Sequence, residues 1–137
     1  MKTKAFRQTV TFSKAKPMEV YNLIMDARKH SAFSGSKVKM SNQVDGKFEV
    51  FDGYCTGFNI ELKEGKKIVQ CWHFKEDGWP DDHFSICTFN FSKVPAGTKL
   101  SFSQVAVPEH KVEALKEGWK LYYWNPMKAY LAGNRSK

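Results

Sequence analysis

Residues 100–130 read LSFSQVAVPEHKVEALKEGWKLYYWNPMKAY, and the spacing of their apolar side chains changes at Pro108. Before this proline, apolar and polar residues largely alternate, which is typical of a β-strand. After it, apolar residues recur every three or four positions, which predicts a long amphipathic helix. Because Pro126 lacks a backbone N–H, we expect a kink or break near Asn125. The predicted apolar stripe consists of Val112, Leu115, Trp119, Tyr122, Pro126 and Tyr130.

The residues before this stretch carry regular turn signals. Between the turns, the chain is rich in aromatic and β-branched residues, and Phe58, Ile60 and Leu62 alternate with polar residues as one face of a strand. Such spacing predicts a meander of antiparallel hairpins. The turns are expected at Asp45-Gly46, Asp52-Gly53, Glu64-Gly65, Asp77-Gly78 and Ala96-Gly97.

The N-terminal third predicts one strand and two short helices. Phe6–Phe12 has the period of a strand, Pro17 suits the first turn of a helix, and Asp26–Phe33 suggests a second short helix. A long meander must cover its apolar face, and the C-terminal helix is the one large element available. We therefore expect an α+β fold in which a curved antiparallel sheet wraps around that helix, with two short helices after the first strand, as a single domain over residues 1–137.

Composition limits the class of protein. The 137 residues are 42% hydrophobic and 15% aromatic, which excludes a disordered chain, and the formal net charge is +8. No segment resembles a secretory signal or a membrane span. Three cysteines without a CxxC pair favour reduced thiols, so we expect a cytoplasmic protein. If the turn between their strands is centred near Trp79, Cys71 and Cys87 lie opposite each other; otherwise they are small buried apolar side chains.

Several short motifs occur in an order that resembles a known family. The chain resembles the C-terminal domain of the activator of the ninety-kilodalton heat-shock chaperone's ATPase, within the START-like, Bet v 1-like SRPBCC superfamily. The resembling segments are Phe51-Asp52-Gly53 with Gly57-Phe58, Lys67-Ile68-Val69 with Trp72-His73-Phe74, Trp79-Pro80 with His83-Phe84, Val107-Pro108, and Gly118-Trp119 with Tyr122-Tyr123.

The resemblance implies a helix-grip fold and a non-catalytic, co-chaperone-like stress protein whose partner is a heat-shock chaperone. In the eukaryotic activators this domain follows a separate N-terminal domain, which has no counterpart in residues 1–137. The alternative is a carrier or sensor of a small hydrophobic molecule, because related folds often hold an apolar ligand between sheet and helix. A third alternative is a cyclase-type enzyme in which His73 or Tyr122 acts as acid or base.

The aromatic residues define the candidate ligand site. They either fill the core themselves or line a cavity, and glutamines on otherwise apolar strand faces would supply its polar groups. Gly53 and Gly57 either form a ligand-approach loop or provide a turn and a bulge that bend the sheet. The candidate cavity residues are Phe33, Phe48, Gln70, Trp72, Phe102, Gln104, Trp119, Tyr122 and Tyr123.

Positive charge is concentrated near the N-terminus, where residues 1–47 hold ten Lys and Arg against three Asp and Glu. An acidic protein surface is the expected partner, whereas nucleic-acid binding would require exposed stacking aromatics, which here belong to the core. The alternative is a basic face that is merely solvated. The candidate partner-binding residues are Lys2, Lys4, Arg7, Lys14 and Lys16.

Neither a metal site nor a cofactor is expected. His73, His83 and His110 lack the close spacing of metal ligands, and the sequence contains no nucleophile-elbow or phosphate-loop motif.

Overall fold

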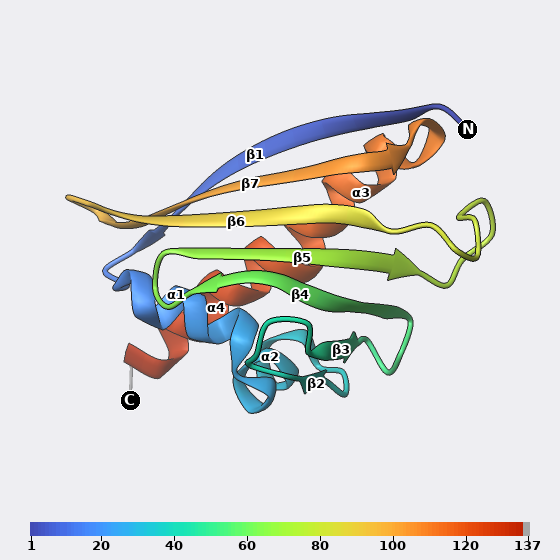
Figure 1. Cartoon of the computed structure of the whole chain (residues 1–137). Helices are drawn as coiled ribbons and strands as arrows, with labels where there is room; N and C mark the ends of the chain where they lie inside the picture. The colour runs from blue at the N-terminus through green and yellow to red at the C-terminus, as the bar shows by residue number, and fades with distance from the viewer. Residues whose placement is uncertain (136–137) are drawn as a thin grey trace.

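The computed structural model describes residues 1–135. Their seven strands form one antiparallel sheet (Figure 1). The strand order is β1-β7-β6-β5-β4-β3-β2, so each strand from β2 to β7 lies beside the next one in the chain, while β1 pairs with β7. The strands are β1 (Thr3–Ser13), β2 (Lys39–Met40), β3 (Lys47–Val50), β4 (Cys55–Lys63), β5 (Lys67–Phe74), β6 (Ser85–Val94) and β7 (Gly97–Pro108).

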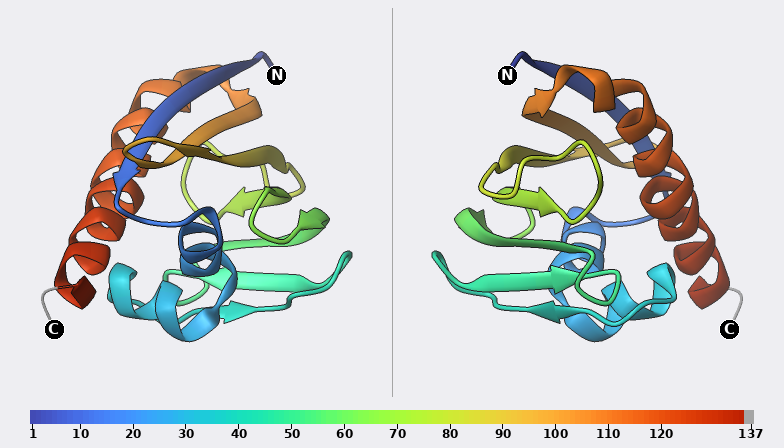
Figure 2. Two further views of the ribbon diagram at one scale, coloured as in Figure 1. Left: turned by 90° about the vertical axis from the view of Figure 1, so that its left-hand side faces the viewer. Right: turned by 90° about the vertical axis from the view of Figure 1, so that its right-hand side faces the viewer.

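Helices cover one side of this sheet. Figure 2 shows the sheet curving, with the C-terminal helix lying along its concave side and two short helices between the ends of β1 and β2. This arrangement confirms the predicted α+β helix-grip fold. The helical segments are α1 (Pro17–Met25), α2 (Ala27–Ser34), the 3-10 helix η1 (Glu109–Lys111), α3 (Val112–Trp119), the π-helix η2 (Lys120–Trp124) and α4 (Asn125–Arg135).

The two short helices begin at residues suited to that role. Pro17 occupies the first turn of α1, where its missing N–H costs nothing, and the Glu19 carboxylate accepts a hydrogen bond from the Lys16 N–H at 2.9 Å. Asp26 separates the helices, because its carboxylate accepts the free N–H groups of Arg28 and Lys29 at 3.0 and 3.1 Å. Both predicted short helices are confirmed.

The C-terminal helix changes its winding where a break was predicted. The N–H of Asn125 bonds to the carbonyl of Lys120, five residues earlier, as in a π-helix. This turn holds one more residue than an α-turn, so the buried face moves from Tyr122 to Tyr123. The predicted stripe is therefore wrong at Tyr122, which is 59% exposed. The residues buried along this helix are Trp119, Tyr123, Trp124, Met127 and Leu131.

Strand β4 also directs its side chains differently from the prediction. Gly57 and Asn59 lie on the buried face, and Phe58 points to the other side of the sheet. A bulge between Asn59 and Glu61 leaves Ile60 without a partner residue on β5. The expectation that Phe58, Ile60 and Leu62 share one face is therefore wrong.

Gly53 and Gly57 have different roles, since Gly53 turns the chain and Gly57 allows a close approach of its neighbours. Gly53 has φ +90° in the turn before β4, a conformation that favours glycine. Gly57 lies within the strand, where a Cβ atom would collide with the carbonyl oxygen of Cys71 and lie 2.6 Å from the ring of Phe48. The turn expected at Gly53 is present, and the bulge lies at Ile60 instead of at Gly57.

The register of β5 and β6 separates the two cysteines. Cys71 pairs with Ile86, and Cys87 pairs with Gln70. The centre of the connection is therefore shifted from the expected position, and a shift of one residue reverses the face on which a side chain lies. Cys71 and Cys87 consequently point to opposite faces, so the cross-strand pairing is wrong. Cys55, Cys71 and Cys87 are all buried free thiols.

Candidate functional site

A layer of aromatic rings fills the middle of the space between sheet and helix. The indole of Trp119 lies at its centre, and the ring of Phe48 extends the layer beyond Trp72, with centroids 5.1 Å apart. Such close contacts between tilted rings are those of a packed core. The rings around Trp119, with their centroid distances, are Phe102 (4.4 Å), Tyr123 (4.6 Å), Trp72 (5.1 Å), Trp124 (5.4 Å) and Phe89 (5.9 Å).

The two buried glutamines accept hydrogen bonds from two indole N–H groups of this layer. The Gln70 carbonyl oxygen accepts the N–H of Trp72 at 2.9 Å, and that of Gln104 accepts the N–H of Trp119 at 2.8 Å. The Gln70 amide group donates to Asn59, and the Gln104 amide group donates to Ser85, each at 2.9 Å. Among the described residues, every buried side-chain nitrogen or oxygen has a hydrogen-bond partner. Both glutamines are thus used within the core.

A cavity of about 390 Å³ opens beside this layer, where the end of the sheet meets α3 and η2. Its walls are mainly aromatic and aliphatic, with Trp72, Trp119 and Tyr123 at the inner side and Tyr122 among the residues that line it. Glu76 contributes a carboxylate to the lining. This carboxylate accepts a hydrogen bond from the Tyr54 hydroxyl and lies 3.4 Å from the Lys111 ammonium, so its charge is already balanced.

The structure divides the nine predicted cavity residues into two groups. Trp72, Trp119, Tyr122 and Tyr123 line the cavity. Phe33, Phe48, Gln70, Phe102 and Gln104 lie in the buried core outside it.

His30 is a buried residue that the sequence analysis did not single out. Its Nδ1 lies 2.9 Å from the Ile24 carbonyl oxygen and its Nε2 lies 2.8 Å from the Tyr123 hydroxyl, while its ring stacks on Phe33 with centroids 5.0 Å apart. Because a carbonyl can only accept, Nδ1 carries the proton and Nε2 accepts from Tyr123. The spacing of His30 and Phe33, three residues apart on one helix face, was the available signal.

Burial keeps this pair in its neutral form. Desolvation lowers the pKa of His30 to about 4, although the Ile24 carbonyl acts in the opposite direction. Desolvation also raises the pKa of the Tyr123 hydroxyl well above its ordinary value. At neutral pH the histidine is therefore neutral and the tyrosine protonated, and the hydrogen bond between them connects α2 to the C-terminal helix. The neighbouring thiol of Cys55 lines the cavity, and burial raises its pKa as well, so it stays protonated.

The other histidines lie away from the cavity. His73 Nδ1 lies 2.9 Å from the carbonyl oxygen of His83, and His83 Nε2 lies 2.6 Å from that of Ala106. His73 therefore does not share a site with Tyr122, the other acid–base candidate. Residues 1–135 contain no group of three His, Cys, Asp or Glu side chains placed to hold a metal ion. None of the helices within that range has the length and apolar character needed to cross a bilayer.

The five candidate basic residues are all exposed and are spread along β1 and its two ends. β1 is an edge strand of eleven residues, so Lys2 and Lys16 lie at opposite ends of it. Lys2 and Lys4 lie beside Glu109 and Glu113, whereas Arg7 points to the convex side of the sheet. The cations thus follow the free edge of the sheet as a line and do not form one compact patch.

Comparison with known proteins identifies related chains. The human "Activator of 90 kDa heat shock protein ATPase homolog 1" is 30% identical over 112 residues, which are 82% of this chain and 32% of the relative. A homologue from Dictyostelium discoideum is 33% identical over 105 residues, covering 76% of this chain and 27% of the relative. The chain thus spans about a third of the length of the curated relatives it matches.

Solved structures show the same fold. The crystal structure of an HSP90 activator from Plasmodium falciparum superimposes with a TM-score of 0.83 at 25% identity, covering 94% of this chain and 96% of that one. A protein from Mesorhizobium loti superimposes with a TM-score of 0.81 at 15% identity, covering 98% and 99% of the two chains, which shows the fold alone.

The family model described as "Activator of Hsp90 ATPase homolog 1-like protein" matches residues 14–132. This match extends from the end of β1 through most of α4, and so includes both short helices, the other six strands and the aromatic layer. The chain therefore belongs to the family of Activator of Hsp90 ATPase homolog 1-like proteins.

Proposed function

We propose that this protein is a non-catalytic binding protein that engages a ninety-kilodalton heat-shock chaperone and raises its ATPase rate. The observation that carries the proposal is the similarity to the Plasmodium falciparum HSP90 activator over nearly the full extent of both chains. The partner would present an acidic surface, since the exposed cations Lys2, Lys4, Arg7, Lys14 and Lys16 follow the free edge of the sheet.

The test uses the purified chain and the purified chaperone from the same organism. We expect binding in titration calorimetry and a higher rate of ATP hydrolysis by the chaperone when the chain is added. Binding should weaken as NaCl is raised, because exposed charges are screened within about 10 Å at 0.1 M salt. Absence of both binding and rate change would overturn the proposal.

A second candidate function follows from the cavity of about 390 Å³, whose volume is within the range of small-molecule sites. The chain would then carry or sense a small apolar molecule held beside Trp119 and Tyr122. Gly118 offers a direct test, because it lines the cavity and a Cβ there would meet only the Tyr122 ring, at 3.9 Å.

A leucine at Gly118 would extend from the cavity wall and occupy part of the space. We expect Gly118→Leu to abolish the fluorescence increase of an apolar dye such as anilinonaphthalene sulfonate. Gly133→Leu is the matched control, since Gly133 is also a helix glycine, a Cβ added there would meet no atom within 4 Å, and the residue lies outside the cavity. Equal dye binding by both variants would contradict a ligand-binding cavity.

A further inference from the structure

The convex face of the sheet carries an apolar row that no helix covers in the described part of the chain. Figure 1 looks onto this face, with the C-terminal helix behind the sheet. The register places Val105 opposite Ile86, Ile86 opposite Cys71, and Cys71 opposite Phe58. Neighbouring strands lie about 4.8 Å apart, so this row crosses four strands over about 14 Å.

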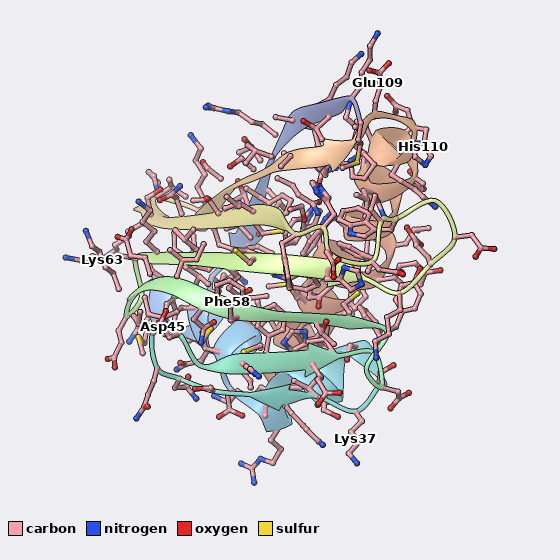
Figure 3. All side chains as sticks on the ribbon, turned by 45° about the vertical axis from the view of Figure 1, so that its right-hand side comes forward. Lys37, Asp45, Phe58, Lys63, Glu109 and His110 are labelled. Atoms are coloured by element: carbon pink, nitrogen blue, oxygen red, sulfur yellow. The ribbon has the colours of Figure 1, made fainter. Side chains whose placement is uncertain are left out.

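These side chains point outward because their neighbours along each strand point into the core. Gln104 precedes Val105, Cys87 follows Ile86, and both are completely buried on the concave side. Figure 3 labels Phe58 within β4 and Lys63 at the end of the same strand. The row is therefore a feature of the surface.

Phe84 enlarges the row into a patch. Its ring lies 5.5 Å from that of Phe58 and 5.8 Å from that of His73, between centroids, and it remains 40% exposed. Val105 is 38% exposed, Phe58 and Ile86 are half-buried, and Cys71, which stands between Phe58 and Ile86 in the row, is buried. The water-facing side of an antiparallel sheet usually carries polar side chains. A cluster of exposed apolar side chains there is therefore typical of an interaction surface.

The adjacent positions on the same face are polar apart from Val69, which pairs with Thr88 and Glu61, so the patch is local. In the neighbouring row Arg7 pairs with Ser103, and Ser103 pairs with Thr88. In the row beyond it Thr9 pairs with Ser101, and Ser101 pairs with Asn90.

The charges around the patch specify the chemistry of its partner. The carboxylates that the strands direct to this face are neutralised by lysines: Glu61 lies 3.5 Å from Lys63 and 3.6 Å from Lys67, and Glu49 lies 3.8 Å from Lys39. The cations on the same face that have no ion pair with any described residue are Arg7, Lys47 and Lys99. Among the side chains that the strands direct to this face, the charge left without an ion pair is therefore positive, while the exposed Asp81 and Asp82 lie in the connection that leads to Phe84.

We propose that this outer patch, defined as Phe58, Phe84, Ile86 and Val105, docks onto an acidic protein surface that presents apolar side chains. The partner's identity rests on the proposed function, in which this acidic surface belongs to the heat-shock chaperone. A second copy of the chain is a less suitable occupant, because self-association through this face would place one set of the unpaired cations Arg7 and Lys47 against another.

The first test replaces Ile86 and Val105 together by threonine, which keeps the β-branched shape and removes only the apolar surface. We expect binding to the purified chaperone to weaken about tenfold, while the thermal unfolding midpoint changes little. Leu121→Gln is the matched control, since Leu121 is an exposed apolar residue of the C-terminal helix, and it should bind as the unaltered chain does. Equal binding by the threonine variant and the unaltered chain would overturn the docking surface and leave the proposed function standing.

A second test does not depend on the chaperone. The probes are two synthetic peptides, one alternating glutamate with valine and phenylalanine, the other with lysine in place of glutamate. In the ¹⁵N-labelled chain, we expect the acidic peptide alone to shift the amide signals of β5, β6 and β7 along the patch. If the chain fails to bind the chaperone, the proposed function is wrong. The amide shifts caused by the peptides still test the docking surface in that case. Signal shifts with both peptides, with neither peptide, or only around the cavity would overturn the docking surface. It would also be overturned if sedimentation showed a dimer of the chain that the threonine variant abolishes.

Discussion

The two faces of one sheet differ in how their apolar side chains are used. On the concave face, Trp72 and Phe102 are buried against Trp119 of α3, and the indole N–H groups of Trp72 and Trp119 bond to glutamines. On the convex face, Phe84 and Val105 keep more than a third of their surface exposed. The concave face therefore contributes mainly to stability, and the convex face is available for contact with another molecule.

Removal of the central indole is expected to have the largest effect. Trp119→Ala removes the ring that contacts Trp72, Phe102, Tyr123 and Trp124, and should lower the free energy of unfolding by about 4 kcal/mol. Urea unfolding followed by circular dichroism measures this loss. Trp119→Phe, which retains most of the ring volume, should lose less; an equal loss in both variants would mean that ring packing is not the cause.

Acidification is expected to weaken the concave side through His30. The pKa of His30 is about 4 in the folded chain against 6.5 for a free side chain, so between these values only the unfolded chain gains a proton. The free energy of unfolding should fall by about 3 kcal/mol as pH drops from about 7 to about 4, and this contribution should then stay constant. Denaturant unfolding at a series of pH values measures the slope.

The variant His30→Gln isolates this contribution. Glutamine can donate to the Ile24 carbonyl and accept from the Tyr123 hydroxyl, but it does not titrate. Its stability should depend less on pH than that of the unaltered chain across this range. Identical slopes would show that other groups cause the pH dependence.

Loss of a buried hydrogen bond is expected to have an intermediate effect. Gln104→Leu leaves the Trp119 N–H without its acceptor and should lower the free energy of unfolding by about 2 kcal/mol. The double variant Gln104→Leu/Trp119→Phe removes donor and acceptor together. A double-mutant cycle should therefore reveal coupling between the two positions, and strictly additive losses would contradict it.

The smallest effect is expected on the convex face. Val105→Thr exchanges one apolar group for a hydroxyl that reaches water, and the free energy of unfolding should change by less than about 0.5 kcal/mol. A loss comparable to that of Gln104→Leu would remove the distinction between the two faces.

Short-range patterns predicted most of the secondary structure. Glycine-containing turns located the meander, Pro17 located α1, and the period change at Pro108 located the C-terminal helix. Trp72, Trp119 and Tyr123 were correctly expected between sheet and helix, because large apolar side chains on strand and helix faces must be buried. Two predictions failed because one extra residue changed which side chains face the core, at the bulge of Ile60 and at the π-turn of Tyr122. A third, the pairing of Cys71 with Cys87, failed because β5 and β6 pair in a different register.

The sequence by itself determined the order of the elements, the class of fold and the family, because turn residues, side-chain periodicity and ordered motifs are local properties. The tertiary structure alone decided which side of the sheet Phe58 and Cys71 face, how Gln70 and Gln104 are satisfied, and that His30 meets Tyr123. Partners such as His30 and Tyr123 are 93 positions apart in the chain. The positive charge near the N-terminus likewise proved to follow an edge of the sheet, a relation that arises only when β1 is paired with β7.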